Sequence, residues 1–284
     1  MQCTIVDVFA EAPWAGNQLA VVQGCAHLDA ETMQAIAREM NFSETTFVTS
    51  QASDAARVRI FTPERELPFA GHPTLGTAWV LANAAQPPAN AGPFTLQLAA
   101  GDVPVTFDES GKAWMMPPPV HLGDQLSPDS AALLLGVPAA DIDTRYTCRV
   151  ATVGPSFVLV GVDTLASLRS IKIDPEELAR HTKEGQFLGV FAFTHEAYGK
   201  EASFAVRCLV GDGIGEDAAT GSANAAFATL LRAHGNRGRF LVEQGFEIRR
   251  PSRIYLDVDN PIRVGGHIRP VLAGAFHKDN ATPP

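Results

Sequence analysis

The chain has 284 residues, which is enough for about two domains of ordinary size. Its hydrophobic content of 46% can supply a core, while its net charge of −9 argues against binding nucleic acid or an anionic membrane through a basic face. No apolar run approaches the roughly 18 residues of a membrane span, and the N-terminus lacks the basic and apolar regions of a signal peptide. We therefore expect a soluble, cytoplasmic protein.

The strand patterns of the first half are short and frequent, at Cys3–Phe9, Leu19–Val22, Thr45–Val48, Arg57–Phe61, Phe94–Leu98 and Val103–Phe107. Between them, Asp29 is an N-cap for a helix that ends near Asn41. Residues 73–83 predict a second helix with Pro73 at its first position. The run Met115–Pro119 then interrupts regular structure and predicts a domain boundary.

The second half repeats this order of elements. Strands are predicted at Phe157–Val162, Val190–Thr194 and Ser203–Val210. A helix is capped by Asp174, and another runs over Ala223–Ala233. We interpret the two halves as a diverged internal duplication of one α/β unit, with a chance similarity in the order of elements as the alternative.

Two glycine-containing segments lead into helices and predict anion binding. They are Phe69–Gly76 and Asp217–Ala223, in which small residues leave the first backbone N–H groups and the positive end of the helix dipole accessible. The alternative for the first is a tight turn with His72 as a partly exposed cap. The alternative for the second is a helix cap by Thr220 or Ser222 and nothing more.

Polar residues near the starts of two predicted strands are further candidates. Glu44 stands between a helix end and an apolar strand, where partial desolvation suits a general acid or base; an exposed strand-edge charge is the alternative. Asn17 offers a side-chain amide from a loop, or merely closes a turn. The eight histidines show no metal-ligand spacing, and four scattered cysteines form no CxxC pair, so we expect no metal site.

Together these segments resemble the PhzF-like phenazine-biosynthesis family. The resemblance rests on four motifs in order, from about the N-terminus to Gly274: Val6–Val22 with Gly16-Asn17, Ser43–Val48, Phe69–Gly76 and Asp217–Ala223. It implies an α+β protein with the diaminopimelate-epimerase-like fold, in which two similar α/β domains each curl a sheet around a central helix and share a cleft. The implied domains are residues 1–116, to which a final strand near 270–280 returns, and residues 117–269.

The resemblance also implies the chemistry. Glu44 matches the acid/base that takes a proton from one substrate carbon and returns it to another, without a cofactor, and His72 and Asp217 match residues that assist it. The substrate-binding positions implied are Asn17, Gly71, Pro73, Gly221 and Ser222. The substrate is then a small anionic acid, by analogy trans-2,3-dihydro-3-hydroxyanthranilate, and the protein a homodimer.

Two other functions stay open at this point. One is a member of the family that binds a small molecule or a protein without turnover. The other is an epimerase or racemase of an amino-acid-like substrate. Racemases of this fold use two opposed cysteines at the helix openings, and the corresponding places here are predicted to be Gly76 and Ala218, so two-thiol chemistry is excluded.

Overall fold

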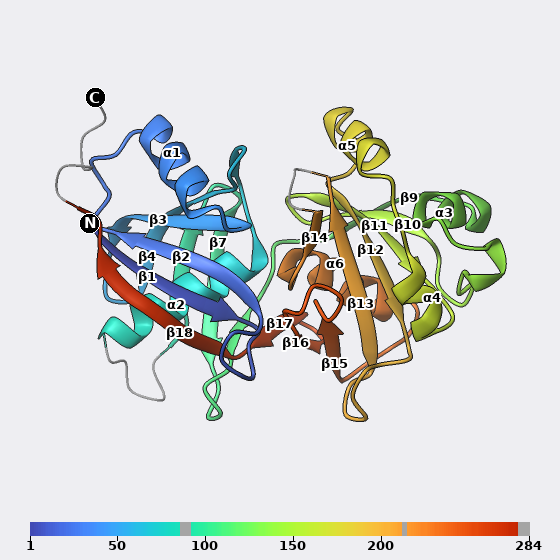
Figure 1. The fold of residues 1–284 in the computed structure, drawn as a ribbon. Coiled ribbons are helices and arrows are strands. Elements are labelled where there is room, and N and C mark those ends of the chain that lie inside the picture. The colour runs from blue at the N-terminus through green and yellow to red at the C-terminus, as the bar shows by residue number, and fades with distance from the viewer. Residues whose placement is uncertain (86–91, 212–214, 278–284) are drawn as a thin grey trace. The chain divides into compact units, whose positions relative to one another are not determined.

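The computed structural model describes residues 1–85, 92–211 and 215–277 (Figure 1). The chain forms two compact units, each described here by itself. The first unit consists of Met1–Pro118 and the chain from Gly265 onward, and the second of Pro119–Val264. The predicted divisions are at residues 116 and 269. The returning strand, β18, spans Ile268–Ala275 and pairs antiparallel with β1, while residues 278–280 of the predicted strand lie outside the described residues.

The first unit is a sheet with two helices. Its strands are β1 (Gln2–Val8), β2 (Asn17–Gln23), β3 (Glu44–Gln51), β4 (Ala55–Phe61), β5 (Glu66–Leu67), β6 (Phe94–Leu98), β7 (Gly101–Phe107), β8 (Ala113–Met115) and β18. Helix α1 spans Ala30–Met40 and helix α2 spans Gly71–Ala85.

The second unit has the same plan with more helices. Its strands are β9 (His121–Gln125), β10 (Arg149–Thr152), β11 (Ser156–Gly161), β12 (Gly189–Thr194), β13 (Phe204–Val210), β14 (Gly215–Asp217), β15 (Arg239–Gln244) and β16 (Ser252–Asp257). Its helices are α3 (Pro128–Leu135), the 3₁₀ helix η1 (Ala139–Asp141), α4 (Leu165–Ser170), α5 (Pro175–Lys183) and α6 (Gly221–Ala233). Strand β17 (Arg263–Gly266) spans the point where the chain returns to the first unit.

The two units repeat one order of strand pairing. In the first, β1 and β2 are antiparallel, β2 and β3 parallel, β3 and β4 antiparallel, β4 and β6 parallel, and β6 and β7 antiparallel. In the second, β10 and β11 are antiparallel, β11 and β12 parallel, β12 and β13 antiparallel, β13 and β15 parallel, and β15 and β16 antiparallel. A short extra strand pairs with the middle of each sheet, β5 with β4 and β14 with β13. This shared connectivity supports the interpretation of the halves as two copies of one unit.

The central helix of each unit is buried on nearly all sides. Every residue from Gly221 to Ala228 of α6 is buried, and α2 buries its first eight residues. Small side chains make this possible, because they let strands approach a helix from several directions. In α2, a Cβ on Gly76 would lie 2.6 Å from Cδ2 of Leu19 and 2.8 Å from Cγ2 of Val8, so the sheet contacts the helix backbone there.

Helix α1 shows how local signals set its bounds. Asp29 Oδ1 accepts a hydrogen bond from Thr32 N at 2.8 Å, and Asn41 ends the helix in the left-handed conformation, donating from its N–H to Ala37 O. Met33 and Ala37 bury the apolar face against Phe47 and its neighbours. This helix was predicted correctly at both ends.

The bounds of the two central helices differ from the prediction. Helix α2 begins at Gly71 rather than at Pro73, and α6 begins at Gly221 rather than at Ala223. A proline is tolerated anywhere in the first helical turn, since the N–H that it lacks would have no partner within the helix. Pro73 therefore correctly predicted that a helix begins near this position, but the predicted first residue was wrong.

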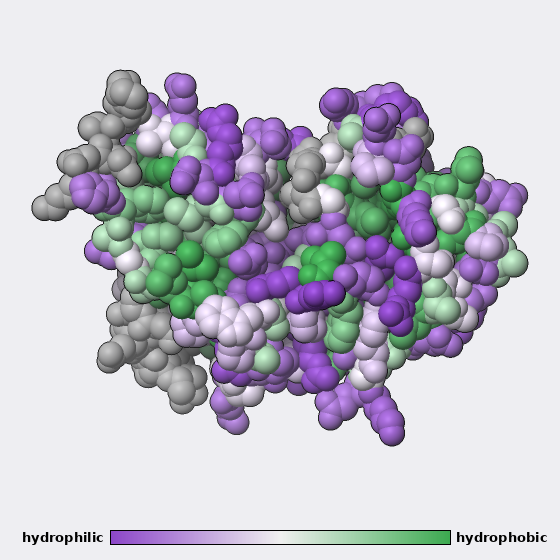
Figure 2. Space-filling model, viewed as in Figure 1, coloured by the Kyte–Doolittle hydropathy of each residue, from purple (hydrophilic) through white to green (hydrophobic). Residues whose placement is uncertain are grey.

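Among the residues described, no helix is long and apolar enough to cross a membrane. On the face shown in Figure 2, hydrophilic residues separate patches of hydrophobic ones.

Candidate active site

The first unit brings three of the predicted site residues together. Asn17 is the first residue of β2, and Glu44 is the first residue of β3. The two strands pair in parallel, and Glu44 lies opposite Leu19 of β2. His72 lies in the first turn of α2. The side chains of Glu44 and His72 are only 13% and 3% exposed. The alternatives of an exposed strand-edge charge and an exposed cap are therefore wrong for these two residues.

A series of hydrogen bonds fixes the His72 ring. The Ser43 hydroxyl donates to Oδ1 of Asn17 at 3.3 Å, and Nδ2 of Asn17 lies 3.2 Å from Nδ1 of His72. An amide nitrogen only donates, so Nδ1 accepts and the proton of a neutral imidazole lies on Nε2. That Nε2 is 3.4 Å from Oε2 of Glu44. The donor side of His72 therefore faces the carboxylate.

The turn before Asn17 needs its glycine. Gly16 has φ +73°, and a Cβ there would lie 2.3 Å from the carbonyl oxygen of Val8. Only glycine adopts this conformation without a clash. The turn at Gly16 thus sets the position of the Asn17 side chain at the start of β2.

The second unit builds a different polar network at the start of its central helix. Asp217 ends β14 and is 7% exposed, and the Thr220 hydroxyl donates to its Oδ2 at 2.6 Å. From β15, Nε2 of Gln244 donates to the Asp217 carbonyl at 3.0 Å and to Oγ1 of Thr220 at 2.9 Å. Oε1 of Gln244 accepts from Thr220 N at 3.1 Å and from Nδ2 of Asn224 at 3.2 Å. The Thr220 side chain therefore holds the Asp217 carboxylate, and the Gln244 side chain holds its carbonyl.

This network overturns one alternative from the sequence. The Thr220 side chain makes no capping hydrogen bond to α6, because its hydroxyl turns back to Asp217. The site residues predicted from the sequence do not include Ser43, Thr220, Gln244 or Asn224. The spacing of Thr220 after Asp217 was a usable signal, whereas nothing in the sequence connects Gln244 to that turn.

Both helix starts have features that favour an anion. In α6 the first bond within the helix runs from Asn224 N to the Thr220 carbonyl at 2.9 Å, so the N–H groups that begin at Gly221 and Ser222 precede the helical ladder. In α2, Gly71 begins the helix, and Pro73 contributes no N–H. The helix dipole adds about half a positive charge at each of these ends.

The residues at the helix openings differ from those predicted. Ala70 immediately precedes α2, and Thr220 immediately precedes α6. Gly76 instead lies inside α2, and Ala218 lies within the turn before α6, so these two do not occupy equivalent places. The assignment of Gly76 and Ala218 to the thiol positions is therefore wrong. The conclusion that neither opening holds a cysteine is unchanged.

The four cysteines carry free thiols in other places. Burial raises the pKa of Cys25 to about 11, and burial together with the nearby Asp217 carboxylate raises the pKa of Cys208 further. A thiol with a raised pKa is a poor proton acceptor near neutrality. Over the described part of the chain, no group of three or more His, Cys, Asp or Glu residues is arranged to hold a metal ion.

Comparisons with known proteins agree with this architecture. A hydroxyproline epimerase from Agrobacterium vitis superposes with a TM-score of 0.62 at 13% identity, covering 96% of this chain and 91% of that one. A phenazine biosynthesis protein of the PhzF family from Bacillus anthracis superposes with a TM-score of 0.83 at 25% identity, covering 96% and 98% of the two chains. The fold is thus the diaminopimelate-epimerase-like fold, in agreement with the sequence-based expectation.

The family follows from sequence comparison. The model of the phenazine biosynthesis-like protein family matches residues 6–274. A trans-2,3-dihydro-3-hydroxyanthranilate isomerase from Pseudomonas aeruginosa is 35% identical over 88% of each chain. A protein from Mesorhizobium japonicum, named an uncharacterised isomerase, is 37% identical over 95% of this chain and 96% of that one. The chain belongs to the PhzF-like phenazine-biosynthesis family.

Proposed function

We propose that this protein is an isomerase that moves a proton between two carbons of a small carboxylic acid, with Glu44 as the acid/base and no cofactor. One observation carries the proposal: a largely buried carboxylate faces the Nε2–H side of His72, whose tautomer is set by Asn17. The isomerase names of relatives at 35% and 37% identity support it.

In the proposed reaction, the Glu44 carboxylate takes a proton from one substrate carbon, and the electron pair left behind is delocalised toward a second carbon. The same carboxyl group then returns the proton to that second carbon, so the reaction needs no redox partner. The Nε2–H of His72 faces Oε2 of Glu44 across 3.4 Å, which orients the carboxylate before the step. The backbone N–H groups of the first turn of α2, which begins at Gly71, would then hold a substrate carboxylate near this pair.

We extend the proposal to the second unit on the basis of the resemblance. Asp217 assists proton handling or orients the substrate, and the helix start at Gly221 and Ser222 binds negative charge. The expectation that both helix starts serve one cleft stays a prediction, which variants in both units test. The substrate proposed is trans-2,3-dihydro-3-hydroxyanthranilate or a closely similar acid, because two relatives are named isomerases of that acid.

The decisive experiment is incubation of candidate acids in heavy water with detection by NMR. We expect deuterium at a substrate carbon together with a shifted double bond. A bound ligand with neither product nor exchange would favour the binding-only alternative. A racemic product from a chiral substrate would favour the epimerase.

The assembly remains a proposal as well. We propose a homodimer from the family resemblance alone. Size-exclusion chromatography with light scattering checks it, and a mass near that of one chain would refute it.

A further inference from the structure

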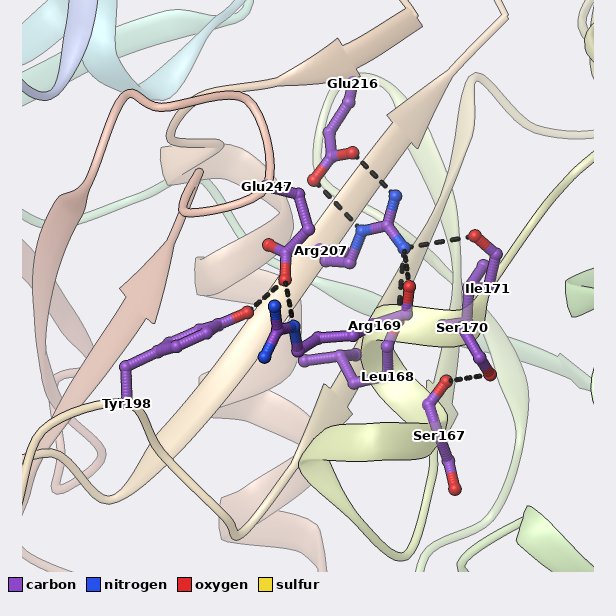
Figure 3. Close-up of polar contacts among 9 residues, drawn as sticks. All are labelled: Ser167, Leu168, Arg169, Ser170, Ile171, Tyr198, Arg207, Glu216 and Glu247. Carbon is purple, nitrogen blue, oxygen red and sulfur yellow. Dashed lines mark hydrogen bonds and ion pairs between the residues drawn. The ribbon is translucent and has the colours of Figure 1, made fainter.

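Arg207 on β13 is the most heavily bonded charged side chain near the candidate site of the second unit (Figure 3). Its side chain is 9% exposed, like that of its partner Glu216. Nε donates to Oε1 of Glu216 at 3.1 Å, and Nη2 donates to Oε2 at 2.7 Å. The remaining nitrogen, Nη1, donates to the carbonyls of Leu168 and Ile171, each at 3.1 Å. Arg207 therefore joins β14 to the end of α4.

Glu216 is the residue before Asp217 in β14, and this strand has only three residues. Side chains alternate along a strand, so Glu216 and Asp217 lie on opposite faces. Asp217 turns to Thr220, while Glu216 turns to Arg207. The bidentate Arg207–Glu216 pair consequently holds β14 on the face opposite to that of the Asp217 side chain.

The first unit contains the equivalent pair, which serves as an internal comparison. Arg59 on β4 makes the same fork to Glu66 on β5, with Nε–Oε1 2.7 Å and Nη2–Oε2 2.6 Å. In each unit the glutamate faces the residue two positions after the arginine, Phe61 in β4 and Leu209 in β13. The two units therefore have an arginine–glutamate ion pair at equivalent positions.

The two pairs differ in what surrounds them. The Arg59–Glu66 pair is 30% and 38% exposed, and the next residue is the apolar Leu67. The Arg207–Glu216 pair is buried, and the next residue is Asp217. Exposed ion pairs contribute little, whereas a buried bidentate pair fixes geometry.

We propose that Arg207 is a positioning residue that acts through Glu216 to hold the Asp217 carboxylate for catalysis. This inference rests on the proposed function, in which Asp217 takes part in the reaction. Lysine at position 207 would keep the charge, so Glu216 would not be left alone, but it lacks the planar fork. A displacement of about 1 Å at a reacting group costs up to about 100-fold in rate.

The test compares Arg207→Lys with the matched control Arg59→Lys, each alone and combined with Asp217→Asn. We expect Arg207→Lys to lower kcat about 10-fold with KM changed less than about 2-fold. In the Asp217→Asn background the same change should alter kcat by less than about 2-fold, because the group it positions is gone. Arg59→Lys should stay within about 2-fold of the wild type.

Two kinetic results would overturn the inference. One is an equal loss from Arg207→Lys with and without Asp217, which would mean a general structural role. The other is an equal loss from Arg59→Lys. Unfolding midpoints are measured for every variant, and if Arg207→Lys does not fold, Glu216→Gln replaces it with the same expected pattern.

A second measurement does not depend on turnover. The carboxyl-carbon chemical shift of Asp217 is recorded by NMR at one pH, and Arg207→Lys should change it while Arg59→Lys leaves it in place. If the wild type exchanges no deuterium with any candidate acid, the isomerase proposal fails, and this chemical shift alone decides whether Arg207 positions Asp217. An unchanged shift would overturn that role.

Discussion

Gly189 occupies in the second unit the place that Glu44 occupies in the first. Glu44 begins β3 opposite Leu19, and Gly189 begins β12 opposite Phe157. A Cβ at Gly189 would lie 2.5 Å from the Leu209 carbonyl oxygen, so no side chain fits there. Of the two equivalent strand starts, only the one in the first unit therefore has a carboxylate. This arrangement suits an isomerase that uses one base, and it disfavours an epimerase that uses two equivalent bases.

Replacing Glu44 by Gln should remove all deuterium exchange at substrate carbon. General acid–base catalysis contributes about 10²–10⁴-fold, and the repeat supplies no second carboxylate at this position to retain part of it. The measurement is NMR in heavy water. Glu39→Gln, which changes an exposed carboxylate on α1, should keep wild-type exchange. Equal activity of the Glu44→Gln variant and the wild type would remove Glu44 from the mechanism.

Replacing Asn17 by Asp should change the protonation of His72. In the wild type, nitrogen-15 shifts should show the neutral ring with its proton on Nε2. An aspartate at position 17 would place carboxylates against both ring nitrogens and favour the doubly protonated ring. We expect activity to fall about 10–100-fold.

The matched control for this change is Gln18→Glu. It makes the same amide-to-acid replacement on the exposed face of the same strand. Its His72 shifts and activity should match the wild type. A wild-type ring protonated on Nδ1 would contradict the hydrogen-bond assignment.

Replacing Thr220 by Val should disturb Asp217 without removing it. The variant loses the hydroxyl that donates to Oδ2 of Asp217 and accepts from Nε2 of Gln244. Leaving such buried groups unpaired costs about 1–3 kcal/mol of unfolding free energy. We also expect roughly 10-fold lower activity. Thr220→Ser keeps the hydroxyl and should restore activity, and failure of this rescue would argue against the network.

Replacing Gly76 by Ala should destabilise the protein, although alanine is the better helix former. The new methyl group would lie 2.6 Å from Leu19 Cδ2 and 2.8 Å from Val8 Cγ2. Overpacking of this kind costs about 1–3 kcal/mol, as urea denaturation would show. Gly123→Ala is the control, because its Cβ would lie at an ordinary 3.5 Å from the Val150 carbonyl oxygen. A Gly76→Ala variant as stable as the wild type would refute the close contact.

Asp108 should contribute stability that depends on pH. Burial opposes its ionisation, but hydrogen bonds from the Ser110 hydroxyl, the Trp114 indole and two backbone N–H groups outweigh burial and lower the pKa of Asp108 to about 2. A carboxyl with a lowered pKa in the folded state stabilises the protein above its unfolded pKa of about 3.9. That contribution is lost as the pH falls through about 2.

Asp108→Asn should therefore be less stable than the wild type by about 1 kcal/mol near neutral pH, which is less than the full pKa shift implies because water screens this exposed carboxylate. The difference should shrink as the pH falls from about 4 to about 2. Urea denaturation across this range measures it. Glu109→Gln removes the neighbouring charge and should show no such trend. A difference that grows on acidification would contradict the assigned direction.

The sequence predicted those elements whose signals are local. Helix α1 carries its caps in its own residues, Asp29 and Asn41, and alternating apolar residues marked most central strands. Strand β9 was missed because His121–Gln125 is polar and largely exposed, so only its pairing with β10 makes it a strand. Strands β15 and β16 lie beyond the last motif and were not assigned.

The candidate site could be only partly predicted. Asn17, Glu44 and His72 each lie in a separate sequence motif, and only the family resemblance groups them. The direction of the Ser43 hydroxyl and the contact of Gln244 with Asp217 depend on packing between elements 20 or more residues apart, which leaves no mark in a local pattern. The first thiol position was misplaced at Gly76 because Pro73 obscured where α2 begins.

The pairing of β1 with β18 gives the chain an unusual order of assembly. Gln2 lies opposite Ala275, so β1 leaves the ribosome before the second unit and acquires this neighbour only after that whole unit has been synthesised. Until then β1 has an open edge that can pair with other chains. Contacts so distant in sequence also close slowly. The nascent protein therefore completes its second unit before its first.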